Sequence, residues 1–256
     1  DQHGPGRVVF RNTRAAMSGF PTRKVQLIPL KTGGSQQGWA KRMSAEFILD
    51  KNNGSARDVK AVYHFSKDPR VTWLVNLLDQ LNPKKVGLIC RSKAKVLALE
   101  KALRALSSAK VGVFHEDLNI VQRDRNAAWF AEENGARILL CSEIGSEGRN
   151  FQFAHHLVLF DLPMHPELLE QRIGRLDRIG QKETIRIFVP FLKGSPQKVL
   201  AHWFHEGLNA FEENIEGGNQ IGQLFGARLF ELAINSIRED VKSDLEALIK
   251  ETASYQ

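Results

Sequence analysis

Short apolar runs alternate with amphipathic stretches between Pro83 and Pro190, and this alternation constrains the fold more than any other feature. The apolar runs have the length of buried strands and lie at 86–90, 111–114, 137–141, 157–160 and 185–189. The stretches with helical spacing between these runs lie at 92–106 and 120–133, and an earlier one lies at 69–81. Asp68-Pro69 and Ser92 are suitable N-terminal caps for two of these helices. The alternation predicts an α/β domain, with a parallel sheet covered by helices on both faces.

The residues before this core differ from it in composition. Residues 1–24 are basic and contain several turn residues, which predicts a linker ahead of a domain at 25–195. Residues 31–53 are rich in Gly, Ser, Gln and Asn. This composition indicates an insertion or flexible loop with one possible short helix at 40–49.

Residues 196–256 are predicted to form a helical extension. Ser195-Pro196 starts its first helix, and Gly217-Gly218 interrupts the helical pattern. A long helical tract is expected from about residue 223 to residue 250.

Charge and cysteine content narrow the class of protein. The 256 residues carry a formal net charge of +7, which is consistent with a polyanionic partner such as nucleic acid. The longest apolar runs are far too short to cross a bilayer, so no membrane partner is expected. Cys90 and Cys141 each close an apolar run, which favours buried thiols in a reducing cytoplasm over a disulfide.

A phosphate-binding loop is absent from the sequence. Neither GxxxxGK[ST] nor a strand followed by GxGxxG occurs, and the nearest strand-end acid to a magnesium ligand is Asp161. A chain of this class that handles a nucleotide therefore supplies only part of the site.

The stretch 165–181 is the most informative motif. Read as one helix, it places Gln171, Arg175 and Arg178 on one face at i, i+4 and i+7, with Arg172 beside them. Gly174 removes a side chain between the arginines, at a cost to the helix of about 1 kcal/mol. Guanidinium groups bind phosphate oxygens and stabilise charge on a transferring phosphoryl group. The alternative is a solvated face whose arginines pair locally with Glu167, Glu170 and Asp177.

The segment from Gln171 to Gln181 resembles motif VI of superfamily-two helicases, and its Arg-Ile-Gly-Gln ending is similar to the SWI/SNF branch. The resemblance implies a RecA-like (P-loop NTPase-type) lobe. It implies that Arg175 and Arg178 are catalytic and reach the γ-phosphate of an ATP held by another lobe, with Arg178 as the finger. It also implies that Gln171 and Arg172 belong to the ATP-binding interface between the lobes.

The segment 141–153 resembles motif V. Gly148 and Asn150 then match the pair that faces the nucleotide, and Ser142 matches the hydroxyl residue that contacts the nucleic-acid backbone. Three residues depart from the family pattern, namely Glu143, Ile144 and Glu147. These departures weaken the expectation of a basic DNA contact in this loop.

Two further strand ends are candidate nucleic-acid contacts. Arg91, Ser92 and Lys93 follow a strand and resemble motif IV, where ligands gather at the carboxyl ends of parallel strands. Ser92 is equally suited to cap the following helix, and both roles are compatible. His115 is a candidate in the next motif, whereas Asp117 is disfavoured because a carboxylate repels phosphate.

Longer stretches, including Trp203-Phe-His-Glu-Gly-Leu208, are similar to the RNA polymerase-associated ATPases of bacteria. This resemblance implies the second motor lobe of a double-stranded nucleic-acid translocase that promotes polymerase recycling. ATP and Mg²⁺ would be held mainly by the first RecA-like lobe of the same protein, so the chain is expected to be inactive alone. The implied location is the bacterial cytoplasm, in association with the nucleoid. The alternatives are a non-enzymatic module that binds nucleic acid or RNA polymerase, and a lobe of another superfamily-two helicase.

Overall fold

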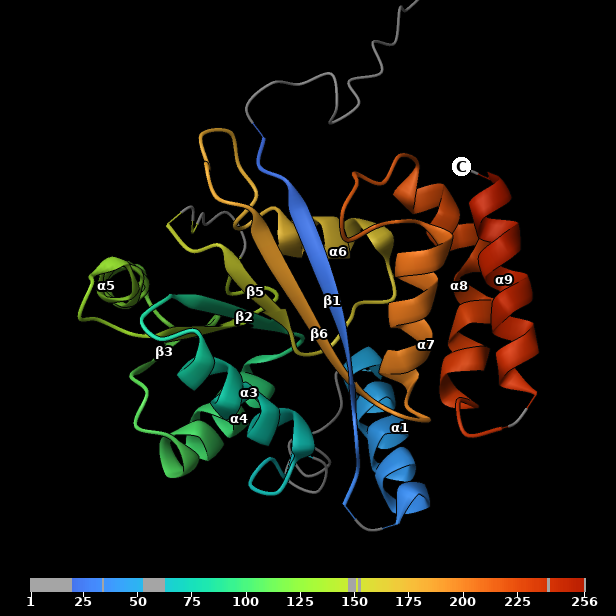
Figure 1. The fold of residues 1–256 in the computed structure, drawn as a ribbon, viewed down its shortest axis with the longest axis horizontal. Helices are drawn as coiled ribbons and strands as arrows, with labels where there is room; N and C mark the ends of the chain where they lie inside the picture. The colour runs from blue at the N-terminus through green and yellow to red at the C-terminus, as the bar shows by residue number, and fades with distance from the viewer. Residues whose placement is uncertain are drawn as a thin grey trace, which may run out of the picture.

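The computed structural model describes residues 20–33, 35–52, 63–146, 151, 153–238 and 240–255. Within these ranges the chain forms a six-stranded sheet in the order β1-β6-β5-β2-β4-β3, and every neighbouring pair is parallel (Figure 1). The strands are β1 Arg23–Leu30, β2 Val86–Cys90, β3 Val111–Phe114, β4 Ile138–Ser142, β5 His156–Leu159 and β6 Ile185–Leu192. The predicted parallel α/β fold is therefore confirmed.

Five of the six strands, β2 to β6, lie where the apolar runs predicted them. β2 and β3 match their expected bounds, and β4 and β5 are each displaced by one residue. β6 continues past Val189 through Pro190, which is tolerated because the pairing with β5 ends at Phe188. β1 was not predicted, because Arg23–Leu30 interrupts its apolar residues with polar ones and with Pro29.

Alternate strand residues face two separate cores. Leu88, Leu140 and Val158 pack with α3 (Pro69–Gln80) and α4 (Lys93–Leu106) on one face. On the other face the strands pack with α5, α6, α7 and the C-terminal helices; α5 is Ile120–Ala131, α6 is Pro166–Ile173 and α7 is Pro196–His202. Side chains of Asp68, Ser92 and Asn119 cap α3, α4 and α5, as predicted for the first two.

Helix α1 (Gln36–Asn52) occupies the stretch predicted as an insertion or loop. The short helix expected at 40–49 is present but extends to 17 residues. Its buried face carries Ala40, Met43 and Leu49 together with the charged residue Glu46. α1 contacts α7 and α8 (Gly218–Ile234), so it belongs to the packed domain.

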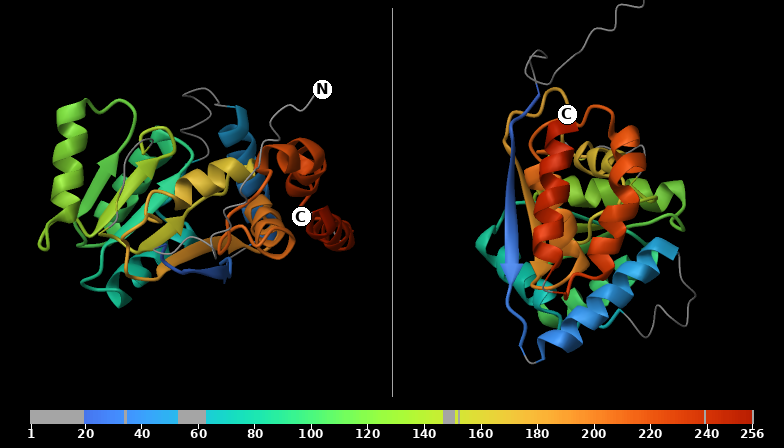
Figure 2. Two further views of the ribbon diagram at one scale, coloured as in Figure 1. Left: turned by 90° about the horizontal axis from the view of Figure 1, so that it is seen from above. Right: turned by 90° about the vertical axis from the view of Figure 1, so that its right-hand side faces the viewer.

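Beyond Gly217, the C-terminal extension forms two helices where one long tract was expected. α8 (Gly218–Ile234) starts after Gly217, which adopts φ of 66°, and α9 (Val241–Tyr255) packs beside α8. Both lie at the end of the molecule away from β3 and α5 (Figure 2). Among the described residues, no helix combines the length and the apolar character needed to span a membrane.

A buried hydrogen bond ties α9 to the rest of the domain. The indole Nε1 of Trp203, in the π-helical turn η2 (Trp203–Gly207), donates to Thr252 Oγ1 at 2.9 Å, and both residues are fully buried. Thr252→Val keeps the shape but removes the acceptor, so the free energy of unfolding should fall by about 1–3 kcal/mol. Guanidinium unfolding would measure this. Thr252→Ser is the control because it keeps the hydroxyl; a valine variant at least as stable as the serine variant would contradict the expectation.

Candidate nucleotide and nucleic-acid interface

The carboxyl ends of the parallel strands bring the predicted strand-end residues to one edge of the sheet. β5, β2, β4 and β3 are consecutive neighbours in the sheet. Arg91 follows β2, His115 follows β3, Glu143 follows β4 and Asp161 lies just beyond β5. This edge is the place where a doubly covered parallel sheet binds ligands.

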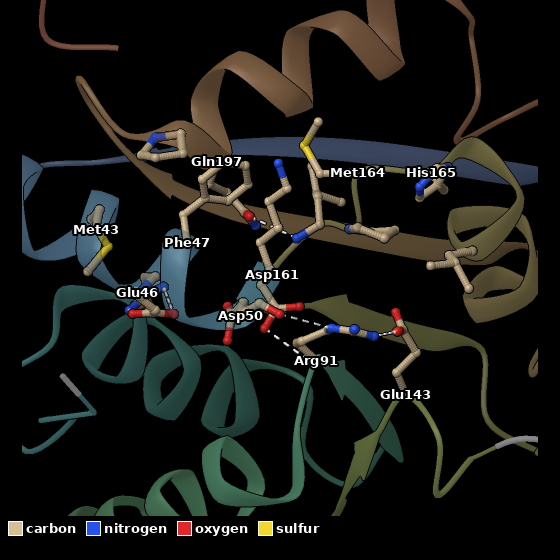
Figure 3. A pocket seen from close by; sticks show the side chains of 16 residues that line it. Met43, Glu46, Phe47, Asp50, Arg91, Glu143, Asp161, Met164, His165 and Gln197 are labelled. Carbon is tan, nitrogen blue, oxygen red and sulfur yellow. Dashed lines mark hydrogen bonds and ion pairs between the residues drawn. The ribbon is translucent and has the colours of Figure 1, made fainter. Parts of the chain in front are cut away.

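A buried network of charges is built around Asp161, which lines the pocket of about 340 Å³ drawn in Figure 3. Its Oδ2 accepts from the Arg91 backbone N–H at 3.0 Å and from Lys95 Nζ at 2.7 Å, and its Oδ1 accepts from Arg172 Nη1 at 3.0 Å. Burial favours protonation of Asp161, but the charges of Lys95 and Arg172 outweigh it and lower the pKa of this carboxyl. Asp161 therefore acts as a counterion within the lobe.

Helix α1 supplies two further carboxylates to this network. Lys95 is fully buried and pairs with Glu46 at 2.9 Å, with Asp50, and with Asp161. Sequence reasoning missed both α1 residues. The signal that could have found them is the spacing of Met43, Glu46 and Asp50, which places them along one helical face.

Glu143 joins the loop after β4 to two arginines. It pairs with Arg91 and with Arg172, whose Nε and Nη2 donate to Glu143 Oε2 at 2.9 and 2.6 Å (Figure 3 labels Arg91 and Glu143). The departure of Glu143 from the family pattern thus has a structural explanation: it neutralises two cations at the strand ends. Arg172 is 2% exposed and directed inward, so its predicted contact with ATP stays a prediction that this geometry does not favour.

The expectation of one helix through 165–181 is wrong. α6 ends at Ile173, Gly174 is its C-terminal cap, and Arg175 and Arg178 lie in the turns that follow. The predicted helix does not continue because the backbone of these turns bonds elsewhere. The Arg175 carbonyl, for example, accepts a hydrogen bond from the N–H of Phe151 at 2.8 Å. Gly180, with φ of 94°, then reverses the chain towards β6.

Gln171, Arg175 and Arg178 nevertheless converge on one surface pocket of about 340 Å³. Arg175 is 8% exposed, whereas Gln171 and Arg178 are exposed. The pocket is also lined by Phe20, Arg23, Glu170, Gly174, Asp177 and Asn214. Two guanidinium groups beside an amide form a donor set that fits phosphate oxygens. Glu170 and Asp177, which were considered for local pairing with the arginines, both form ion pairs with Arg23.

The candidate nucleic-acid contacts have partners within the lobe. The Ser92 hydroxyl accepts from Lys95 N–H at 3.3 Å, as a cap should, and Lys93 pairs with Asp117. Ser142 is 1% exposed, and its hydroxyl donates to Glu116 at 2.6 Å. These contacts confirm the capping role of Ser92, while the nucleic-acid roles of Ser92, Lys93 and Ser142 stay predictions.

His115 lies under the loop that follows β4. It is 7% exposed, and burial lowers the pKa of its imidazole. A Cβ on Gly145 would lie 2.4 Å from His115 Cα, so only glycine permits this close approach. Gly148 and Asn150, the predicted nucleotide-facing pair, lie outside the described residues.

The buried thiols of Cys90 and Cys141 are as predicted. Both cysteines are free and buried, on the neighbouring strands β2 and β4. Burial raises the pKa of both thiols. In the part of the chain that the structure describes, no group of three or more His, Cys, Asp or Glu residues is arranged to hold a metal ion.

Two family models match the chain. The helicase conserved C-terminal domain covers residues 69–180, and the C-terminal domain of the RNA polymerase recycling family covers residues 184–256. The sheet order and the first match define the chain as a RecA-like helicase C-terminal lobe.

Individual relatives match nearly the whole chain at about 50% identity. The RNA polymerase-associated protein RapA of Pseudomonas putida strain F1 is 49% identical over 97% of this chain and 27% of that relative. RapA of strain GB-1 is 52% identical over 91% of this chain and 25% of the relative. The chain belongs to the RapA family, and it spans about a quarter of the length of these relatives. Among solved structures, the C-terminal part of the Fun30 ATPase domain matches with a TM-score of 0.49 and 16% identity, covering 87% of this chain and 64% of that one.

Asp50 makes the charge network sensitive to pH. Burial, together with the nearby Asp161 and Glu46, raises the pKa of Asp50 to about 6. The folded protein then holds a proton that the unfolded chain has lost, so the stability from this proton is present below pH 4 and disappears as pH rises through 6. Between pH 5 and 7, wild type should lose about 1 kcal/mol more unfolding free energy than Asp50→Asn.

Urea unfolding at several pH values would measure the difference between the two proteins. The comparison removes the contribution of the histidines, which both proteins share. Parallel stability curves for wild type and Asp50→Asn would contradict the raised pKa of Asp50.

Proposed function

We propose that the chain is the second motor lobe of a SWI/SNF-type, ATP-dependent nucleic-acid translocase that acts with RNA polymerase in transcription. The observation that carries the proposal is the convergence of Gln171, Arg175 and Arg178 on one surface pocket, in a sequence with no phosphate loop. A site built from arginines alone cannot position ATP and its Mg²⁺, so another lobe must hold them. The lobe is therefore inactive alone.

Arg175 and Arg178 would hold the terminal phosphate of ATP from the side opposite the phosphate loop. Guanidinium groups supplied from a second lobe stabilise the negative charge that develops on a phosphoryl group during its transfer. In this reaction the phosphoryl group would come from ATP bound with Mg²⁺. The exposure of Arg178 supports its role as the finger. The inward orientation of Arg172 supports a different role, which is to fix α6 on Glu143 and Asp161.

The match of residues 184–256 to the RNA polymerase recycling family supports RNA polymerase as a partner. The net charge of +7 supports nucleic acid as a second partner, and so do Arg91 and Lys93 at the carboxyl edge of the sheet. The relatives associate with RNA polymerase, so a cytoplasmic location in association with the nucleoid is part of the proposal.

The finger assignment is tested in a chimera in which this chain replaces the matching segment of the P. putida relative. We expect no ATP turnover from the isolated chain and duplex-stimulated turnover from the chimera. Arg178→Ala should lower kcat of the chimera by about 10³–10⁵-fold, because an arginine finger contributes that much in related chemistry. Lys182→Ala is the matched control, since it removes an exposed cation nearby. A chimera that keeps its turnover after Arg178→Ala would refute the finger assignment.

The nucleic-acid contact is tested with the isolated chain and duplex DNA, by fluorescence anisotropy at several salt concentrations. Phosphate contacts predict an affinity that falls steeply with salt, and Arg91→Ala should reduce the slope of the double-logarithmic plot by about 1. Arg104→Ala, which removes an exposed arginine paired with Glu100 on α4, should leave the slope unchanged. Binding that does not respond to salt would instead favour a protein partner.

A further inference from the structure

Arg23 holds the turn that carries Arg175 and Arg178, although it belongs to a different element. Its Nε donates to Asp177 Oδ2 at 2.6 Å, and its Nη2 and Nη1 donate to the two oxygens of Glu170 at 2.6 and 3.1 Å. The Arg23 side chain is 2% exposed and that of Asp177 is 1% exposed. One guanidinium thus joins α6 to the turn behind it.

The contacts of Arg23 with Glu170 and Asp177, here called the Arg23 clamp, lie where α6 gives way to turns. Past Gly174 the backbone is held by turn contacts such as Arg175 N–H to Arg172 O at 3.3 Å and Leu176 N–H to Ile173 O at 3.1 Å. Asp177 lies between the two arginines in sequence, so its position determines where the side chain of the next residue, Arg178, projects from the surface. A planar guanidinium bound by two carboxylates fixes direction as well as distance.

The clamp itself is anchored on the sheet. Arg23 is the first residue of β1 and pairs in register with Ile185 of β6, and the Thr22 carbonyl accepts from Ile185 N–H at 2.9 Å. Phe20 and Arg23 line the same pocket as Arg178. The segment expected to lead from the first lobe therefore enters the domain directly at the proposed catalytic pocket.

We infer that Arg23 is a positioning residue that sets the orientation of the Arg178 side chain towards ATP. The inference rests on the proposed function of Arg178 as the finger. Arg23 itself stays bound to Glu170 and Asp177 and does not touch the nucleotide. Its loss should lower the rate of phosphoryl transfer more than it weakens ATP binding, because ATP is held mainly by the other lobe.

The test uses the chimera with the P. putida relative. Arg23→Gln removes the charge and most donors, and should lower kcat by up to about 10²-fold, the effect of a displacement of about 1 Å at a reacting group. The KM for ATP should change much less. Arg23→Lys keeps the charge without the planar fork and should restore part of kcat.

Thr252→Val is the control for a loss of stability. It removes the buried hydrogen bond from Trp203 Nε1, and Thr252 lies on α9, outside the residues that line either pocket. This variant should lower the melting temperature and leave kcat of the folded protein near that of wild type. A purely structural role for Arg23 would give the same kcat in both variants once the folded fraction is taken into account.

The outcomes separate this inference from the proposed function. If Arg178→Ala abolishes turnover but Arg23→Gln keeps the wild-type kcat, the positioning role is wrong and the proposed function stands. If Arg178→Ala also leaves turnover intact, the finger assignment itself is wrong. Should Arg23→Gln fail to fold, Asp177→Asn removes the charge of the same contact, and a wild-type kcat in that variant would overturn the positioning role.

Discussion

The organisation of the lobe depends on a lysine that is buried with its charge. Lys95, at the start of α4, is 0% exposed, and a buried ammonium is tolerated only when carboxylates surround it. Glu46 and Asp50 from α1 and Asp161 from the end of β5 provide them. Removing one partner of such a buried pair typically costs about 3–5 kcal/mol. α1, α4 and β5 are consequently held together by electrostatics as well as by apolar packing.

The same network restricts the loops at the strand ends. Asp161 also binds Arg172 of α6 and the backbone of Arg91, and Glu143 binds both of these arginines. A displacement of one loop would leave charges buried without partners at the others. The carboxyl edge of the sheet therefore behaves as a single platform. Such a platform suits a lobe that is proposed to move as a body against another one.

Local sequence patterns predicted the elements that are specified by their own residues, such as an apolar run or a capping side chain. Apolar runs located five of the six strands, β2 to β6, and Asp68 and Ser92 marked the starts of α3 and α4. β1 was not predicted because Arg23–Leu30 alternates polar and apolar residues and contains no distinctive apolar run. α1 was predicted only as a possible short helix at 40–49, because the composition around it is that of a loop and the helix is stabilised by ion pairs to residues far along the chain.

The sequence predicted which residues form the candidate site better than it predicted their arrangement. Gln171, Arg175 and Arg178 do share one pocket, but turns after Gly174 bring them there in place of a continuous helix. Helical periodicity cannot detect a helix that ends early at a glycine. The contact of Arg23 with Asp177 could not be predicted for another reason. The two residues are 154 positions apart in the sequence, and no local pattern indicates such a pairing.

The two cysteines have a practical consequence for observing how the proposed lobes meet. Cys90 and Cys141 are the only cysteines in the sequence, and both are buried, with thiols whose raised pKa values disfavour the reactive thiolate. Thiol-directed dyes should therefore pass over the native protein. A cysteine introduced at exposed Lys182, a few residues past Arg178, would carry a fluorophore on its own. With an acceptor dye on the other lobe, closure of the proposed motor would then be measured as a change in energy transfer.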